Sequence, residues 1–447
     1  MSFPKRGVGR ERASVGFTSP FDAAFGWKSR ILALVPQGLA TLLGPILECT
    51  RALSREHKHS GHENGEIDAM MVLVAMASVL LIFLVLLDAF ETMLLPRRVR
   101  RQFRFVHYYY VYSWTPWAAL ARVIRSEKQR NTLLSLFGPL SIIVLLAIWA
   151  TGLIMGFALL HWSIGTPLGG REQVGPGLYA YFSGVTFFTL GYGDIIPVAP
   201  LGRFLAVVET GLGLGFLAVT ISYLPVLYQA FSRREVAISL LDARAGSPPT
   251  AGTLLGRLSR FSDLAKLDPT LCEWEHWAAE VLESHLSFPV LSYYRSQHDN
   301  QSWLAALTVI LDTSALVVAT APGSDHSQAW LAFAMSRHVV VDLAQSFFAR
   351  PVDPPSDRLP PERWKVLRET LGRAGLELQD SDAAQRRLKE LRGMYEPFLT
   401  ALSLRFLMPL PPVFLDHDPV DNWQTSAWMR RARGFHQLTQ TPDEHED

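Results

Sequence analysis

The sequence is poor in cysteine and in charged residues. Of 447 residues only two are cysteines, Cys49 and Cys272, which cannot form a framework of disulfides. Charged residues make up 19% of the chain, whereas soluble domains usually contain about a quarter. The net charge is only +1, and a balance so close to neutral argues against a general nucleic-acid-binding protein.

The missing charge is concentrated in three apolar stretches. Residues 69–87, 131–170 and 210–232 contain no Asp, Glu, Lys or Arg. An apolar helix of about 20 residues is long enough to cross a bilayer. The sequence therefore predicts an all-α, multi-pass membrane protein in contact with lipid.

Basic residues between these stretches predict the orientation. Residues 97–131 carry nine Lys or Arg and one Glu, and positive residues in short loops stay on the cytoplasmic side. We therefore expect a transmembrane helix over 67–96 and a basic cytoplasmic loop over 97–132. Arg233 and Arg234 follow the last stretch and place the C-terminus in the cytoplasm as well.

The number of crossings between these two cytoplasmic points must be even. Two apolar runs, 133–162 and 201–231, supply two crossings. A further apolar run, 177–190, must then enter and leave the membrane on the outer face. The charge pattern therefore predicts a re-entrant segment.

The N-terminal region, 1–66, leaves two interpretations open. Residues 31–47 are uncharged and follow a segment of net charge +4, which fits a short first crossing with a cytoplasmic N-terminus. They also contain Pro36 and Pro45 and are short for a span, which fits an interfacial helix instead. A cleaved signal peptide is disfavoured, because the run starts late and ends without a small-residue cleavage pattern.

The predicted re-entrant segment ends in the motif Thr-Leu-Gly-Tyr-Gly-Asp at 189–194. Successive carbonyls that point toward one axis need alternating signs of φ, and glycine reaches positive φ without a Cβ clash. Gly191 and Gly193 meet that need. Placed between two spans, the motif makes residues 133–231 resemble the two-helix pore of the potassium channel superfamily.

The resemblance implies an architecture and an activity. It implies an outer helix at 133–162, a pore helix at 178–188, a selectivity filter at 189–193 and an inner helix at 201–231. In such a pore, oxygens from four chains replace the water around K⁺. The protein is therefore expected to be a homotetramer that conducts K⁺ passively and selectively.

The resemblance also assigns the ion site. K⁺ would bind in the filter formed by Thr189, Leu190, Gly191, Tyr192 and Gly193, with the Thr189 hydroxyl and the carbonyls of the first four residues as ligands.

Asp194 would lie at the outer mouth of this filter. Two departures from the family pattern leave a weakly selective cation channel as an alternative. Leu190 stands where Val is more frequent, and Val185 stands where some members carry a Glu that braces the filter.

Three residues of the expected inner helix are candidates for gating. Gly213 is either a bending hinge or a site of close helix packing, and Pro225 can kink the cytoplasmic end. Glu209 is a carboxyl group in an apolar helix, where ionisable groups are costly and usually functional. It could brace the filter in place of Val185, pair with Arg203, or bond as a protonated carboxyl to a neighbouring helix.

The C-terminal half, 232–447, is acidic, with 22 basic and 28 acidic residues after position 232. Its apolar residues recur at helical spacing and include no uninterrupted apolar run of 18 residues, so a mainly helical cytoplasmic domain is expected. The acidic tail, 443–447, is expected to be disordered.

This half shows no catalytic, nucleotide-binding or metal-ligand spacing at Cys272, His276 or Asp312. We therefore expect no enzyme and no cofactor, and the regulatory ligand of this half stays unidentified. A membrane-anchored signalling protein with a vestigial pore is the remaining alternative. The expected location is the cell membrane, which is the inner membrane if the source is bacterial.

Overall fold

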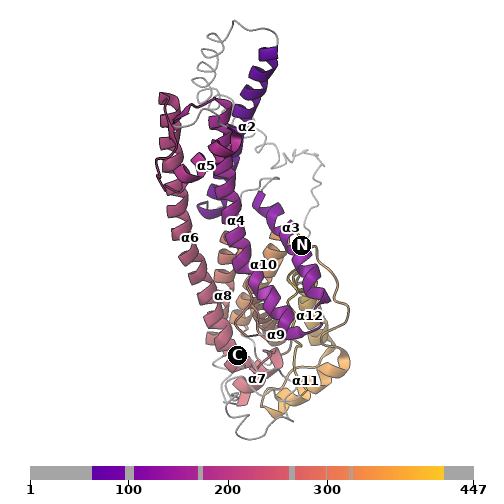
Figure 1. Cartoon of the computed structure of the whole chain (residues 1–447). Coiled ribbons are helices and arrows are strands. Elements are labelled where there is room, and N and C mark those ends of the chain that lie inside the picture. The colour runs from indigo at the N-terminus through magenta and orange to yellow at the C-terminus, as the bar shows by residue number, and fades with distance from the viewer. Residues whose placement is uncertain are drawn as a thin grey trace, which may run out of the picture.

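The computed structural model describes residues 63–95, 105–169, 175–260, 267–298, 300–321, 323 and 326–416. The predicted short span at 31–47, the arginines between 97 and 104, and the acidic tail lie outside the described residues. The described part consists of helices and one small two-stranded sheet (Figure 1). The predicted all-α fold class is therefore confirmed.

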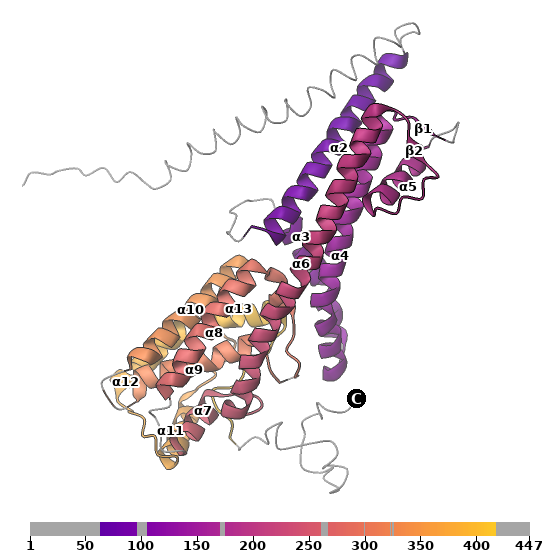
Figure 2. The same ribbon diagram turned by 90° about the vertical axis from the view of Figure 1, so that its left-hand side faces the viewer.

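Three long helices form a rod: α2 (Glu63–Met93), α4 (Glu127–Ser163) and α6 (Pro200–Ala245). They run side by side in both views of the molecule (Figures 1 and 2). Each is long and apolar enough to cross a membrane. Large apolar side chains on the rod, such as Leu73 and Ile143, are exposed, and lipid is the solvent that such a surface requires.

Helices α2 and α4 pack closely through small residues. A Cβ atom added at Gly156 of α4 would lie 2.6 Å from Cγ1 of Ile82 in α2, and one at Gly152 would lie 3.1 Å from Val85. Glycines four residues apart allow two membrane helices to approach in this way. This Gly-x-x-x-Gly spacing is a sequence signal for the contact, although none of the predictions used it.

The predicted loop over 97–132 was wrong for its second part. Residues Phe105–Val123 form helix α3, and α4 already begins at Glu127. The physical reason is an apolar face that recurs every four residues, with Val106, Tyr110 and Trp114 buried. That face packs against the rest of the protein, so the aromatic run belongs to a docked helix.

The predicted domain boundary at 232 also falls inside a helix. Helix α6 continues without a break to Ala245, because Ile238 and Leu241 are buried in the same apolar core as the C-terminal helices. A single helix therefore connects the rod to the C-terminal lobe, as Figure 2 shows.

The C-terminal lobe is a cluster of helices at one end of the rod (Figures 1 and 2). Its elements are α7 (Ala251–Arg260), α8 (Leu267–Ser287), the 3-10 helix η2 (Pro289–Tyr293), α9 (Trp303–Thr320), α10 (Ser327–Ser346), α11 (Pro361–Arg373), α12 (Asp382–Gly393) and α13 (Glu396–Phe406).

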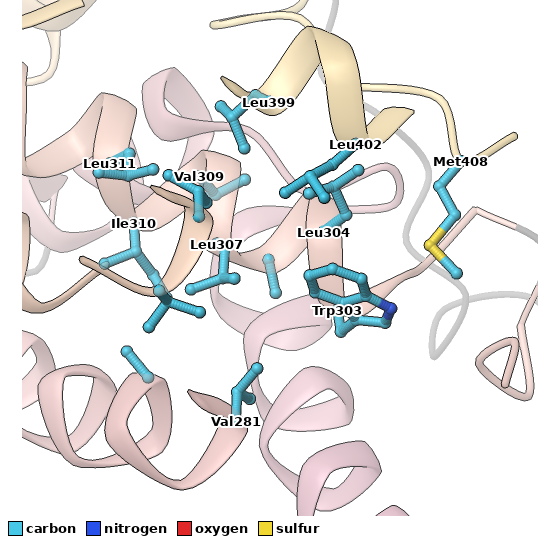
Figure 3. Packing of buried hydrophobic residues seen from close by; sticks show 14 of the residues in the cluster. Val281, Trp303, Leu304, Leu307, Val309, Ile310, Leu311, Leu399, Leu402 and Met408 are labelled. Carbon is cyan, nitrogen blue, oxygen red and sulfur yellow. The ribbon is translucent and has the colours of Figure 1, made fainter. Parts of the chain in front are cut away.

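Helix α9 is the centre of this lobe. Figure 3 shows its side chains Leu304 and Leu307 among Val281 of α8 and Leu399 and Leu402 of α13. By length and hydropathy α9 also qualifies as a membrane span, but 89% of its apolar window is buried inside the protein, against 11% for α2. A helix that is apolar all round and covered by protein is a core helix.

The C-terminal half thus has no uninterrupted apolar run of 18 residues, yet α9 reaches the mean hydropathy of a membrane span. Its single acidic residue, Asp312, interrupts the apolar run in the sequence. In the structure this carboxylate is paired inside the lobe and accepts two hydrogen bonds from Arg358, at 2.7 and 2.9 Å. Pairing is what allows a charge in the middle of a core helix.

Arg358 also donates to Glu396 at 3.1 Å, and the Tyr395 hydroxyl donates to Asp312 at 2.6 Å. Burial opposes the charge on Arg358, but Asp312 and Glu396 outweigh it and raise the pKa of this guanidinium above its usual value. The network ties α9 to the segment before α11 and to α13.

Candidate functional site

A short helix, α5 (Pro176–Phe187), lies beside the ends of α4 and α6 that are far from the C-terminal lobe (Figure 2). Pro176 occupies its first turn, where a missing backbone N–H costs nothing. Tyr179, Ser183 and Phe187 share its buried face, and the Tyr179 hydroxyl donates to the carbonyl of Thr166 at 2.8 Å. The predicted pore helix, 178–188, therefore coincides with α5 to within two residues at each end.

The two ends of this segment are joined by a small sheet. Strand β1 (Leu168–Gly169) follows α4, strand β2 (Ile196–Pro197) precedes α6, and the two pair in antiparallel orientation. Because β1 and β2 are hydrogen-bonded neighbours, the chain leaves and returns at the same end of the rod. This is the geometry of the re-entrant segment that the even number of membrane crossings predicts.

The backbone between α5 and β2 alternates in the sign of φ. Thr189, Gly191 and Gly193 have φ of 56°, 63° and 74°, while Leu190 and Tyr192 between them do not have positive φ. Glycine adopts this conformation freely, whereas a threonine held there is strained. Sequence reasoning identified the two glycines but had no signal for the positive φ of Thr189.

The side chains of this segment are largely uncovered in the single chain. Leu190 is 52% exposed and Tyr192 is 67% exposed. Asp194 accepts a hydrogen bond from the Tyr181 hydroxyl of α5 at 3.1 Å, which ties the end of the segment back to the short helix. Val185 faces a groove of about 540 Å³ that Thr189, Asp194 and residues of α6 also line.

Glu209 of α6 is fully buried behind α5. Its carboxyl group contacts the hydroxyl of Ser183, and its second oxygen lies 3.9 Å from Nε2 of His161 in α4. The sequence left three interpretations of Glu209 open: bracing the filter, pairing with Arg203, or bonding to a neighbouring helix. In the structure its contacts are with Ser183 of α5 and His161 of α4, both on neighbouring helices. Arg203 donates elsewhere, to the carbonyl of Pro197 at 3.1 Å.

Gly213 lies one turn after Glu209, against the end of α5. A Cβ atom added at Gly213 would lie 2.2 Å from the carbonyl oxygen of Phe187. The packing interpretation of this glycine therefore has a direct structural basis. Helix α6 runs without interruption through both Gly213 and Pro225.

The C-terminal lobe contacts the rod around residue 294. The ring of Tyr294 packs against Gly138 of α4, so closely that a Cβ added at this glycine would lie 2.5 Å from the ring. The centre of the same ring lies 5.5 Å from the centre of the Phe231 ring in α6. The buried Arg234 of α6 donates to the carbonyls of Leu291 and Tyr294 at 2.9 and 3.1 Å. These contacts connect η2 of the lobe to two helices of the rod.

The lobe shows no metal site in the residues that the structure describes. His276 is bonded to the carbonyl of Cys272 within α8 at 2.8 Å. The buried His285 has its pKa lowered, first by burial and then by the nearby Arg234, so it is neutral at physiological pH. The buried His285 is part of the packing of the lobe, whereas His276 is exposed on α8.

Comparison with known proteins supports this assignment of the membrane part. A family model described as "Ion channel", for the two-helix type, matches residues 143–229. An uncharacterised membrane protein of Bacillus subtilis (strain 168), YdjJ, is 28% identical over 182 residues. That match covers 40% of this chain and 52% of the relative, so the chain spans about half the length of the curated relative it matches.

No solved structure matches the chain. The matched residues include most of α4, all of α5, the 189–194 segment and the first part of α6. A helix, a re-entrant segment and a second helix are therefore present both in the geometry and in the family match. The match of residues 143–229 to the two-helix ion-channel family and the membrane relative together support an ion channel of the potassium-channel-like superfamily.

Proposed function

We propose that this protein is a passive, K⁺-selective channel whose filter is the segment Thr189 to Gly193. The observation that carries the proposal is the alternation of φ along the segment, with positive values at Thr189, Gly191 and Gly193. Such alternation turns consecutive carbonyls toward one side, and a row of carbonyls can replace the water around K⁺. The ligands are the Thr189 hydroxyl and the carbonyls of residues 189–192, with Asp194 at the outer mouth.

The position of α5 supports the same site. Its C-terminal end, at Phe187, comes two residues before Thr189. The C-terminal end of a helix carries partial negative charge, which favours a cation nearby. The helix thus stabilises an ion at the inner end of the filter.

One chain supplies one filter segment, so a ring of carbonyls requires several copies. The exposure of Leu190 and Tyr192 supports an assembly in which neighbouring copies cover these side chains. We propose a homotetramer in the cell membrane, surrounded by lipid.

The orientation follows from the basic residues. The arginines before α3 and those after Phe231 favour the cytoplasmic side, so the C-terminal lobe is placed in the cytoplasm. Its contacts with α4 and α6 through Tyr294 provide a route by which the lobe gates the pore at the inner helix.

The direct test is ion flux with the full-length protein in liposomes. Wild type is expected to carry K⁺, with a reversal potential far from zero when K⁺ faces Na⁺. Gly191→Ala is expected to abolish the flux, because φ is +63° at that position and an L side chain is strained there. Gly175→Ala is the matched control, since nothing lies within 4 Å of its added Cβ.

Two results would overturn the proposal. A reversal potential near zero in wild type would indicate the weakly selective cation channel. An absence of flux, with all cellular function retained by Gly191→Ala, would indicate a signalling protein with a vestigial pore.

The gating route has its own test. Tyr294→Ala is expected to shift the single-channel open probability severalfold, because it removes the ring between α4 and α6. Tyr112→Ala, at a side chain exposed on α3, is the control and is expected to leave the open probability unchanged. An unchanged open probability in Tyr294→Ala would contradict this route.

A further inference from the structure

The contact between Glu209 and Ser183 lies at the junction of three helices. Glu209 comes from α6, Ser183 from α5 and His161 from α4, and all three side chains are fully buried. In this region the protein is surrounded by apolar residues and lipid, so a bare charge has no water to stabilise it. The protonation state of Glu209 is therefore decided by its hydrogen-bond partners.

The hydroxyl group of Ser183 has two acceptors within reach. Its Oγ lies 2.7 Å from the carbonyl oxygen of Ile154 in α4, and it also contacts Oε1 of Glu209. A hydroxyl carries one proton, so Ser183 can serve both acceptors as a donor only by sharing that proton in a weaker three-centre bond. Each contact is a full hydrogen bond when Glu209 is a protonated carboxylic acid that donates to Ser183, while Ser183 donates to Ile154.

The groups around Glu209 do not supply a close cation. Nε2 of His161 is 3.9 Å from the carboxyl group, too far for a hydrogen bond, and Nδ1 of the same ring lies 3.1 Å from the Thr166 hydroxyl. Arg203, earlier on α6, donates to Pro197.

The tyrosines of α5 are also engaged elsewhere. Tyr179 donates to the Thr166 carbonyl, and Tyr181 donates to Asp194. On α2, which packs against α4, the buried polar Ser78 bonds within its own helix. A neutral Glu209 therefore fits this set of partners better than an ionised one.

Helix α5 is attached to α6 at two points, and the contact between Ser183 and Glu209 is one of them. Ser183 and Phe187 are four residues apart on α5, and Glu209 and Gly213 are four residues apart on α6. Residues at this spacing lie on one face of a helix. The hydrogen bond at Glu209 and the close backbone contact at Gly213 thus fix both the position and the rotation of α5 on α6.

We propose that Glu209 acts as a neutral, hydrogen-bond-donating positioning residue, which holds α5 against α6 and thereby sets the spacing of the filter carbonyls. The inference rests on the proposed function of the pore. Its consequence is that ion selectivity depends on a donor at position 209 and not on a negative charge there.

The first experiment measures the protonation state directly and does not depend on conduction. The infrared difference spectrum between full-length wild type and Glu209→Gln is expected to contain the C=O stretching band of a protonated carboxylic acid at neutral pH. If the difference contains only carboxylate bands, Glu209 is ionised and the proposal is overturned.

The second experiment separates donor from charge by reversal potentials in K⁺ and Na⁺. Glu209→Gln keeps a donor and is expected to keep the K⁺/Na⁺ permeability ratio. Glu209→Leu and Ser183→Ala remove the bond and are expected to lower the ratio severalfold, because α5 is then no longer held in the position that sets the filter. Thr210→Val, whose hydroxyl bonds only within α6, is the matched control.

His161→Gln decides between a neutral acid and an ion pair. It cannot carry a positive charge, and it is expected to keep the permeability ratio. If His161→Gln and Glu209→Gln both lose selectivity, an ion pair holds the helices and the proposal fails. If wild type itself is not selective, the proposed function fails, while the infrared band still decides whether Glu209 is neutral.

Discussion

Arg358 is the residue at which the buried charges of the C-terminal lobe meet. It holds the carboxylates of Asp312 and Glu396, and Arg392 donates to Glu396 as well, at 2.8 Å. Three helices depend on these pairs, because α9, α12 and α13 each contribute a member.

Arg358→Met is expected to lower the free energy of unfolding by about 3–5 kcal/mol, because it leaves two buried carboxylates without their shared partner. Chemical denaturation of the full-length protein in detergent, followed by tryptophan fluorescence, measures this. Arg368→Met is the control, because its partner Asp380 is exposed and an exposed pair contributes about 1 kcal/mol or less. Equal effects of the two substitutions would contradict the role of burial.

Asp357 predicts how the lobe responds to acid. Burial would raise the pKa of its carboxyl group, but hydrogen bonds from the Leu359 N–H and from Arg392 outweigh burial and lower that pKa. A lowered pKa stabilises the folded state above the unfolded value of about 3.9, and this contribution is lost as the pH falls below it. In Asp357→Asn the dependence of stability on pH below about 4 is expected to flatten, and an unchanged acid profile would contradict the assignment.

Thr189 is the residue of the filter segment that carries backbone strain. Its φ of 56° places a side chain where it costs about 1–2 kcal/mol. Glycine would relieve this cost but would remove the hydroxyl that the proposed ion site uses. The choice of threonine is therefore consistent with a functional requirement at this position.

Among the elements, α6 has the most roles. It closes the re-entrant loop at Pro200, supports α5 through Glu209 and Gly213, and ends inside the C-terminal lobe at Ala245. At 46 residues it is roughly 70 Å long, more than twice the thickness of a bilayer core of about 30 Å. Its parts therefore lie in different surroundings and respond differently to substitution.

Gly213→Ala is expected to abolish ion flux or reduce it at least tenfold, because its Cβ would overlap the Phe187 carbonyl, 2.2 Å away, and displace α5. Gly211→Ala is the matched control on the same helix, since nothing lies within 4 Å of its added Cβ. Liposome flux of the two variants measures the difference. If Gly213→Ala conducts normally and Gly211→Ala does not, flexibility of α6 matters more than packing.

At the scale of the whole molecule, α6 exposes an apolar ridge that begins in the last turn of the expected membrane segment and continues past it. The ridge consists of Tyr228, Val236 and Leu240, which are 65%, 59% and 53% exposed. Val236 and Leu240 follow the apolar stretch and Arg233 in the sequence, where lipid tails are no longer expected to cover them. If the protein assembles as the proposed tetramer, a second copy of the chain is the partner that this exposed ridge would meet.

Replacing Val236 and Leu240 together by Glu is therefore expected to reduce the tetramer fraction, because it puts like charges on a surface that meets its own copies. Native mass spectrometry of the purified protein measures that fraction. Replacing Val366 and Leu404 of the lobe, which are also exposed, gives the control. A tetramer that survives the first pair of substitutions would show that the ridge faces something else.

Much of the membrane part could be predicted because its signals are local. An uncharged run of about 20 residues must be in lipid or in a core, and Gly191 and Gly193 mark a backbone that needs positive φ. Basic residues before and after the apolar runs predicted that both ends lie on one side of the membrane and hence a re-entrant segment, and β1 and β2 pair at the two ends of that segment. These inferences needed no knowledge of which distant residues meet.

The remaining features depend on contacts between residues that are far apart in the chain, and only the tertiary structure decided them. The sequence left three interpretations of Glu209 open, and the fold placed Ser183, 26 residues away in the chain, beside it. Gly213 became a packing position because Phe187 lies against it. Helix α9 has the composition of a membrane span, and it is a core helix because the lobe surrounds it: composition measures how much apolar surface a helix has, whereas packing determines whether lipid or protein covers it.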